Sequence, residues 1–290
     1  MIYELKNEFL TVKVDSLGAE LISAVGADGH EYVWPAEPGC WESHAPILFP
    51  ACGRLLNSQY TYRGTTYNMN AHGFASKSEF KALRATSSAL TLMLKSNEST
   101  KEIYPFDFTF TAEYTLVGNA LSLALTVRND SRDLLPYMVG WHPGFVLEGE
   151  EPIGDFTLKM DAKNNSVVWY PLQNGCFIRP YGEDYQLTNG SYPLTEEEIY
   201  KNDTMIFVGT GNSARLSSPG STHTVNMTWS DNLPYFCIWK DDFSAARFIC
   251  LEPWSDVPGT GDVEENFDTR KMSRLAPDAF ETYTYRVVLA

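Results

Sequence analysis

The sequence FDFTFTAEYTL, residues 106–116, is the stretch that decides the fold. Its even-numbered positions are apolar, and its odd-numbered positions carry Asp, Thr and Glu, with Glu113 on the polar side. Such an alternation puts successive side chains on opposite faces of an extended chain. The stretch therefore predicts a β-strand with one face in a core and the other toward water.

The same period of two recurs along the chain, with turn dipeptides such as Gly118-Asn119 between the stretches. Helical signal is confined to the capping-box pattern Thr195–Glu198, which predicts a short helix to about Lys201. Strand after strand with short turns predicts an all-β fold, a large antiparallel β-sandwich or a barrel. The other alternating stretches are Phe9 to Val14, Leu90 to Leu94, Leu121 to Val127, Met205 to Val208, Tyr235 to Trp239, Phe248 to Leu251 and Tyr283 to Leu289.

Composition and charge narrow the class of protein. The chain has no composition break, linker or internal repeat, so we expect one domain over residues 1–290. The chain has 22 Lys and Arg residues and 37 Asp and Glu residues, which gives a net charge of −15. This negative charge disfavours binding to a nucleic acid or to an anionic membrane surface. The N-terminus lacks a signal-peptide pattern, and the five cysteines form no CxxC pair. We therefore expect a cytoplasmic protein with reduced thiols.

The sequence matches a common nucleotide-binding motif only loosely and lacks the usual metal-ligand and serine-hydrolase motifs. The stretch GTGNSA, residues 209–214, matches a loose dinucleotide-binding pattern, but SSPG at 217–220 forbids the helix that this pattern needs. A glycine-rich hairpin explains the stretch better. The five histidines form no HxH or HExxH pair, and no G-x-S-x-G elbow occurs. The sequence thus predicts neither a metal nor a cofactor.

Three short segments place an ionisable residue beside Gly, Pro or an aromatic residue at the end of a strand-like run. Apolar neighbours would bury Glu252, and a buried carboxylate with a shifted pKa is a candidate general base. Histidine suits the role of general acid, so two histidines and one glutamate indicate proton transfer. The segments are NAHGFA (70–75), GWHPGF (140–145) and CLEPW (250–254).

These three segments, in this order along the chain, make it resemble the aldose 1-epimerase family, also called galactose mutarotase-like proteins. The resemblance is to a divergent bacterial-type branch of this family. CGRLLN (52–57) and the closing run from Leu275 to Leu289 support the resemblance, which spans nearly the whole chain. The resemblance implies a large antiparallel β-sandwich with a sugar-binding cleft. It also implies interconversion of the α and β anomers of a free hexose, with no cofactor.

The resemblance also implies a role for each site residue. Glu252 would take the proton of the C1 hydroxyl, His142 would protonate the ring oxygen, and His72 would orient the sugar and stabilise developing charge. Arg54 and Asp203 would bind sugar hydroxyls.

Two tryptophans are further candidates for sugar contacts. Trp141 and Trp254 lie next to the candidate acid and base in the sequence, and an indole face can stack on the apolar face of a pyranose. Packing in the core is the alternative interpretation for most of the seven tryptophans.

Two alternatives stay open beside the epimerase of free sugars. The first is the same chemistry on a hexose 6-phosphate, although a phosphate site normally recruits clustered Arg or Lys. The second is a carbohydrate-binding or sensing protein without turnover. The small-molecule sugar is the expected partner in each case. The preferred aldose and the oligomeric state remain open.

Overall fold

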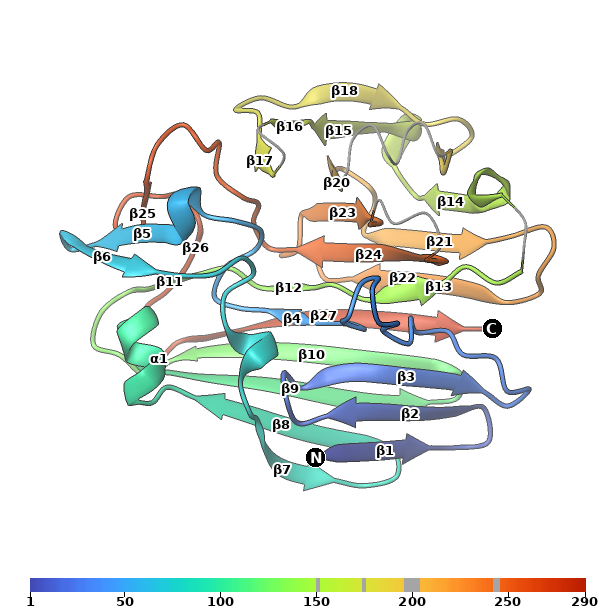
Figure 1. Cartoon of the computed structure of the whole chain (residues 1–290), viewed down its shortest axis with the longest axis horizontal. Helices are drawn as coiled ribbons and strands as arrows, with labels where there is room; N and C mark the ends of the chain where they lie inside the picture. Colours follow the sequence, from blue (N-terminus) through green and yellow to red (C-terminus); the bar gives the residue numbers. More distant parts are fainter. Residues whose placement is uncertain (150–151, 174–175, 196–203, 242–245) are drawn as a thin grey trace.

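A computed structural model describes residues 1–149, 152–173, 176–195, 204–241 and 246–290. Two large antiparallel sheets form its body (Figure 1). The nine-stranded sheet has the order β19 (Ser191–Pro193), β14 (Thr157–Met160), β21 (Ser213–Ser217), β22 (Thr224–Trp229), β27 (Phe280–Leu289), β10 (Ala120–Asn129), β9 (Phe108–Val117), β8 (Ala89–Lys95) and β7 (Lys81–Ala85). The eight-stranded sheet has the order β18 (Glu183–Gln186), β15 (Ser166–Tyr170), β20 (Thr204–Val208), β23 (Tyr235–Trp239), β24 (Phe248–Trp254), β12 (Gly140–Trp141) and β4 (Ile47–Leu48), with β13 (Gly144–Val146) paired to β24.

Smaller elements surround these two sheets. A three-stranded sheet, β1 (Ile2–Lys6), β2 (Leu10–Asp15) and β3 (Glu20–Gly26), packs over β8, β9 and β10, where the Tyr114 hydroxyl donates to Ala19 O at 2.8 Å (Figure 1). The remaining strands are β11 (Leu135–Tyr137) with β26 (Ser273–Leu275), β16 (Leu172–Gln173) with β17 (Phe177–Ile178), and β25 (Glu265–Asn266) with β5 (Gln59–Tyr62) and β6 (Thr65–Asn68). The described helices are α1 (Glu98–Ile103) and the 3₁₀ turns η1 (Leu56–Ser58), η2 (Ala75–Lys77), η3 (Ile153–Asp155) and η4 (Lys163–Asn165).

The stretch that opened the sequence analysis forms β9. Its residues alternate between buried and less buried along the strand, and β9 pairs with β8 on one side and β10 on the other. The β9–β10 hairpin turns at Gly118, whose φ of +57° is unstrained in glycine. All the other alternating stretches also form strands, so the prediction of an all-β, large antiparallel β-sandwich is confirmed.

The structure differs from the sequence predictions at two points and leaves one untested. The helix α1 was missed, because it rests on a local capping box at Asn97 and Thr100 rather than on a helical period. The stretch 209–214 is no hairpin, since β20 before it and β21, which begins within it at Ser213, belong to different sheets. The helix predicted from Thr195 to about Lys201 falls, beyond its first residue, within residues 196–203, which lie outside the described residues.

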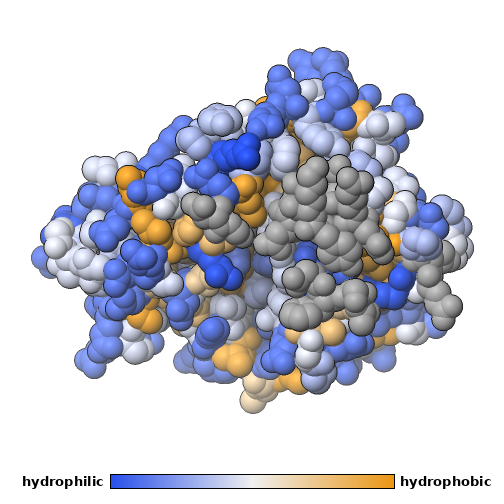
Figure 2. Space-filling model, turned by 45° about the horizontal axis from the view of Figure 1, so that its top comes forward, coloured by the Kyte–Doolittle hydropathy of each residue, from blue (hydrophilic) through white to orange (hydrophobic). Residues whose placement is uncertain are grey.

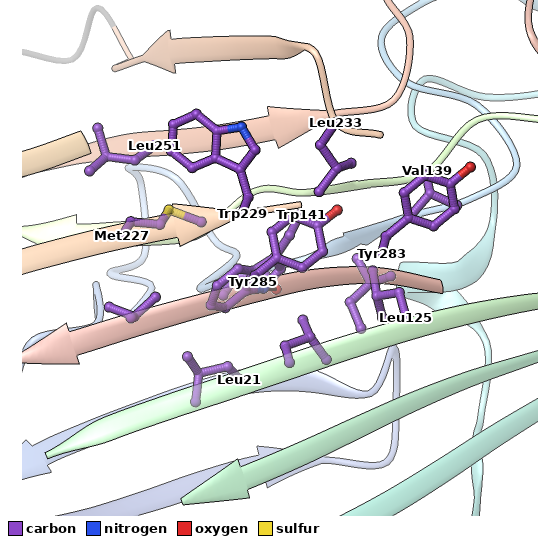
Figure 3. Packing of buried hydrophobic residues seen from close by; sticks show 14 of the residues in the cluster. Leu21, Leu125, Val139, Trp141, Met227, Trp229, Leu233, Leu251, Tyr283 and Tyr285 are labelled. Atoms are coloured by element: carbon purple, nitrogen blue, oxygen red, sulfur yellow. Dashed lines mark hydrogen bonds between the residues drawn. The ribbon is translucent and has the colours of Figure 1, made fainter. Parts of the chain in front are cut away.

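The core lies between the two large sheets. Trp229 of β22 stacks on Phe236 of β23, with ring centroids 4.8 Å apart. Figure 3 shows Leu251 of the eight-stranded sheet in the same cluster as Met227 and Tyr285 of the nine-stranded sheet. Hydrophilic residues cover most of the face drawn in Figure 2. No described helix is long and apolar enough to span a membrane.

Strand β24 decides where the site lies. All seven of its residues are buried, although its side chains alternate between two faces. Ile249 and Leu251 join the core between the sheets, whereas Cys250 and Trp254 belong to separate clusters on the opposite, outer face. Because side chains two apart share a face, Glu252 lies on the outer face with them.

Candidate active site

A cavity of about 360 Å³ lies on the outer face of the eight-stranded sheet. This volume falls within the usual range of small-molecule sites. The strands supply its floor, and the loops before β4 and around residues 53–77 supply its walls. The residues on which the chemistry depends are Trp41, Arg54, His72, Lys77, His142, Trp239, Glu252 and Trp254.

Glu252 and His142 form the floor of this cavity. Glu252 is fully buried, and His142 is 8% exposed. His142 follows β12, where its backbone N–H donates to Pro46 O at 3.0 Å. Its Nε2 lies 3.2 Å from Glu252 Oε2. Neither carboxylate oxygen of Glu252, nor Nδ1 of His142, has a hydrogen bond of normal geometry in the described structure. The pair therefore keeps bonding capacity for a ligand.

His72 stands beside this pair and is held by its own loop. Its backbone N–H donates to Gly53 O at 2.8 Å, while its Nδ1 accepts the Gly53 N–H at 3.1 Å. Because Nδ1 is an acceptor, the proton of the neutral ring is on Nε2. The rings of His72 and His142 are nearly perpendicular, with centroids 5.6 Å apart. His72 is thus a fixed, neutral hydrogen-bond donor at the cavity wall.

Close backbone contact explains the glycine that follows His72. Gly73 has a φ of +75°, and a Cβ at this position would lie 2.2 Å from Phe49 O. Phe74 N–H also donates to Phe49 O, at 3.0 Å. His72 itself has a φ of +64°, a conformation that most residues with a side chain avoid. Only glycine at position 73 allows the loop to press against residue 49 and present His72 to the cavity.

Burial controls the proton affinity of the floor pair. It raises the pKa of Glu252 well above its usual range, and the Trp254 indole N–H nearby offsets only part of this rise. Burial and the neighbouring His72 lower the pKa of His142 well below its usual range. Burial thus favours the uncharged form of both groups, a protonated Glu252 carboxyl beside a neutral His142 imidazole.

His72 is neutral for a related reason. Burial, with a smaller contribution from the positive charge of Arg54, lowers the pKa of His72 to about 4. The imidazole therefore keeps its Nε2–H donor without a positive charge at neutral pH.

Three tryptophans line the cavity. Trp254, which the sequence predicted as a sugar contact, lies there with its ring centroid 5.7 Å from that of His72. Trp41 and Trp239 were missed, and their centroids lie 5.1 and 5.5 Å from that of His142. The alternation in β23 carried a signal for Trp239, because it shares a face with Cys237, the cross-strand partner of Glu252.

The structure does not bring Trp141 to the cavity. Its indole is buried between the sheets, where Nε1 donates to Ala45 O at 3.1 Å and the ring packs against Tyr285 (Figure 3). The assignment of Trp141 as a sugar contact is therefore wrong. The reason is the strand alternation, which sends neighbouring residues to opposite faces, so that His142 faces the cavity and Trp141 faces the core.

Two cations stand at the cavity wall. Arg54 was predicted there from the sequence, whereas Lys77, at the end of η2, was missed because a lone lysine in a non-periodic stretch carries no signal. The side chains of both residues are exposed. Asp203, the other predicted sugar contact, lies outside the described residues. The three residues predicted for catalysis, His72, His142 and Glu252, do meet in this one cavity.

The described residues also offer two sets of potential metal ligands. At the cavity floor, His142 and Glu252 together with the neighbouring buried Cys250 bring ligand atoms within 4.8 Å of one another. A second set, His30, Glu148 and His223, lies elsewhere on the molecule. All five cysteines are free thiols, in agreement with the prediction from their spacing.

Fold and cavity together define an antiparallel β-sandwich whose outer sheet face carries a buried carboxylate–imidazole pair. The family model described as aldose 1-epimerase matches residues 1–287, and the chain belongs to the aldose 1-epimerase family. The resemblance noted in the sequence is thereby confirmed, and with it the broad class of carbohydrate epimerases.

Similar proteins come from lactic acid bacteria. The chromosomal LacX protein of Lactococcus lactis subsp. lactis is 31% identical over 271 residues, covering 89% of this chain and 88% of LacX. A galactose mutarotase related enzyme from Lactobacillus acidophilus superimposes with a TM-score of 0.92 at 30% identity, covering 100% of this chain and 97% of that one. A galactose mutarotase-like protein from Lactobacillus casei also has a TM-score of 0.92, at 28% identity and with 100% of both chains covered.

Proposed function

We propose that this protein is an aldose 1-epimerase, a mutarotase that interconverts the α and β anomers of a free aldose without a cofactor. The observation that carries the proposal is the 3.2 Å contact between His142 Nε2 and Glu252 Oε2 at the cavity floor. Both groups are buried, both have free bonding capacity, and burial favours the uncharged form of each. Such a pair is suited to exchanging protons with two neighbouring oxygens.

The chemistry follows from where those oxygens are. In a pyranose the C1 hydroxyl oxygen and the ring oxygen are bonded to the same carbon, so an adjacent base and acid can reach both. The reaction uses the ion-pair form of the two groups, which forms when the Glu252 proton passes to His142. Glu252, as carboxylate, then accepts the hydroxyl proton while His142, as imidazolium, donates its proton to the ring oxygen. The C1–ring oxygen bond breaks, and C1 becomes a carbonyl. After rotation about C1–C2, ring closure on the other carbonyl face returns both protons and gives the opposite anomer.

The surrounding residues support this reaction. The His72 Nε2–H is a neutral donor for a sugar oxygen on which negative charge develops. Trp41, Trp239 and Trp254 offer indole faces for the apolar face of the ring. Hydroxyl groups of Ser43, Ser76 and Thr204 also line the cavity and can pair with sugar hydroxyls.

Replacing Glu252 tests the proposal directly. The variant Glu252→Gln keeps the size of the side chain but removes the base, so we expect kcat to fall at least about 100-fold. Polarimetry of freshly dissolved α-glucose and α-galactose, corrected for spontaneous mutarotation, gives the rate. Glu113→Gln on the exposed face of β9 is the matched control and should match the wild type. Near-normal catalysis by Glu252→Gln would remove this residue from the mechanism.

The two cations at the cavity wall favour a second candidate, the same reaction on a hexose 6-phosphate. Arg54 and Lys77 could together bind a phosphate, which a neutral sugar does not require. Comparing kcat/KM for glucose and glucose 6-phosphate in the wild type and in the double variant Arg54→Gln, Lys77→Gln decides between them. A preference for the phosphate that the double variant abolishes would select this candidate.

A sugar-binding protein without turnover is the remaining alternative. It predicts that calorimetry detects sugar binding while polarimetry shows no acceleration by the wild type. That combination would overturn the epimerase proposal. A wild-type rate well above the spontaneous one would instead exclude a pure binding protein.

A further inference from the structure

A second group of ionisable side chains lies away from the candidate active site. His30 follows β3, Glu148 follows β13, and His223 precedes β22, so three distant parts of the chain contribute to it. They border a separate hollow of about 820 Å³, which shares no lining residue with the active-site cavity among the described residues. The side chains of His30 and His223 are only 13% and 20% exposed. This group has no part in the proposed epimerase reaction.

The potential ligand atoms of this group lie close to one another. His223 Nδ1 lies 2.7 Å from Glu148 Oε2, and His30 Nδ1 lies 3.6 Å from Glu148 Oε1. The two imidazole rings are stacked, with centroids 3.8 Å apart and planes inclined by 4°. One ligand atom from each of the three residues lies within 4.8 Å of the other two. Because a metal lies in the plane of each imidazole that binds it, one of the two stacked rings has to turn before two nitrogens and one oxygen surround a single ion.

The surroundings of His223 resemble the support that metal ligands receive. Its other nitrogen, Nε2, lies 2.8 Å from Asp28 Oδ2, and Ser221 Oγ donates to Glu148 Oε2 at 2.5 Å. A metal-binding histidine typically donates its second N–H to a carboxylate, which fixes the ring and strengthens the ligand. Asp28 holds this position, and Ser221 holds the carboxylate ligand.

We propose that His30, Glu148 and His223 form a site for a divalent transition metal, with Zn²⁺ as the best match, and that Asp28 orients His223. Two imidazoles and one carboxylate are a recognised zinc ligand set, with a further position left for water. On binding, the metal replaces the proton at His223 Nδ1, which is released to solvent, while the Nε2–H bond to Asp28 persists. The ion would join the turn after β3, the loop after β13 and the entry to β22.

Isothermal titration of the metal-free protein with ZnCl₂ tests the site. We expect one equivalent bound, and a loss of affinity of at least about tenfold in His30→Gln and in His223→Gln. Asp28→Asn should keep the stoichiometry but weaken binding, because it removes an orienting group rather than a ligand. Since each substitution keeps a polar side chain of similar size, the variants should fold, and circular dichroism checks this point.

The cavity-floor set of His142, Cys250 and Glu252 provides the necessary control, because it could also bind Zn²⁺. We expect His142→Asn to bind Zn²⁺ like the wild type. Zn²⁺ should also raise the Tm of the wild type and of His142→Asn, but not of the double variant His30→Gln, His223→Gln. Absence of Zn²⁺ binding to the wild type would overturn the proposal, as would binding that only His142→Asn abolishes. Mutarotation is not the readout, so this result is independent of the proposed function.

Discussion

At the scale of single residues, the site depends on groups whose charge is set by burial. Burial disfavours the charged form of both Glu252 and His142. His72 is neutral for the same reason, while its bond to Gly53 fixes which nitrogen carries the proton. The sequence could indicate that Glu252 would be buried, from its apolar neighbours. It could not indicate the tautomer of His72, which depends on a contact with a separate loop.

The lowered pKa of His72 predicts a dependence of stability on pH. In the unfolded chain its pKa returns to about 6.5, so below this pH the unfolded state binds a proton that the folded state, with a pKa of about 4, does not. Stability should therefore fall as pH falls from about 6.5 to 4, with His72 contributing at most about 3.5 kcal/mol at about 1.4 kcal/mol per pKa unit.

The variant His72→Asn tests this contribution, since asparagine tolerates the positive φ at this position. Urea unfolding at pH 7 and pH 4 gives the change in the free energy of unfolding for each protein. We expect the loss on acidification to be smaller in the variant than in the wild type. Equal losses would show that His72 is not a buried neutral group.

At the scale of single elements, the alternation of side chains along each strand assigns residues to the core or to the cavity. Strand β24 sends Leu251 to the core and Glu252 to the cavity, and the chain at β12 sends Trp141 to the core and His142 to the cavity. The sequence showed the period but not which strands have a covered outer face. For that reason proximity in sequence to His142 was a poor guide to the position of Trp141.

The loop that carries His72 gives a prediction at this scale. Alanine at position 73 would be unfavourable for two reasons. Its backbone would have to adopt a positive φ, and its Cβ would clash with Phe49 O at 2.2 Å. We expect Gly73→Ala to lower the free energy of unfolding by more than the roughly 1–2 kcal/mol of the backbone penalty alone. It should also lower kcat/KM, because relief of the clash displaces His72.

Gly64→Ala, in the turn between β5 and β6, is the matched control for Gly73→Ala. Gly64 has the same φ of +75°, but a Cβ there meets no atom within 4 Å. This variant should lose only the backbone penalty in urea unfolding and keep its mutarotase activity. If Gly73→Ala behaved like Gly64→Ala in both assays, the close contact at Phe49 would have no role in placing His72.

At the scale of the whole molecule, the two large sheets pack face to face, so one face of each is buried in the core. The outer face of the eight-stranded sheet carries the site. Trp141 of the eight-stranded sheet packs on Tyr285 of the nine-stranded sheet, with ring centroids 5.5 Å apart (Figure 3). Core and cavity are thus separated by the thickness of one sheet. Substitutions on its two faces should have separable effects on stability and on sugar binding.

Two conservative substitutions test this separation. Trp141→Phe loses the bond to Ala45 O and part of the packing between the sheets, so unfolding should become easier by about 1–3 kcal/mol, with KM unchanged. Trp254→Phe on the cavity face should raise KM and change stability less. Urea denaturation and steady-state polarimetry measure the two effects. A raised KM in Trp141→Phe with normal stability would contradict the placement of this indole.

The sequence by itself determined the all-β class, the strands, the family resemblance and the three residues that meet at the cavity, because hydrophobic period and short motifs are local properties of the chain. Only the tertiary structure decided that Trp141 belongs to the core, that Trp41, Trp239 and Lys77 line the cavity, and that His30, Glu148 and His223 converge elsewhere. These facts depend on which faces of which strands are covered and on contacts between segments far apart in sequence. A period of two in the sequence shows that a strand has two different faces. What each face contacts depends on how the sheets pack.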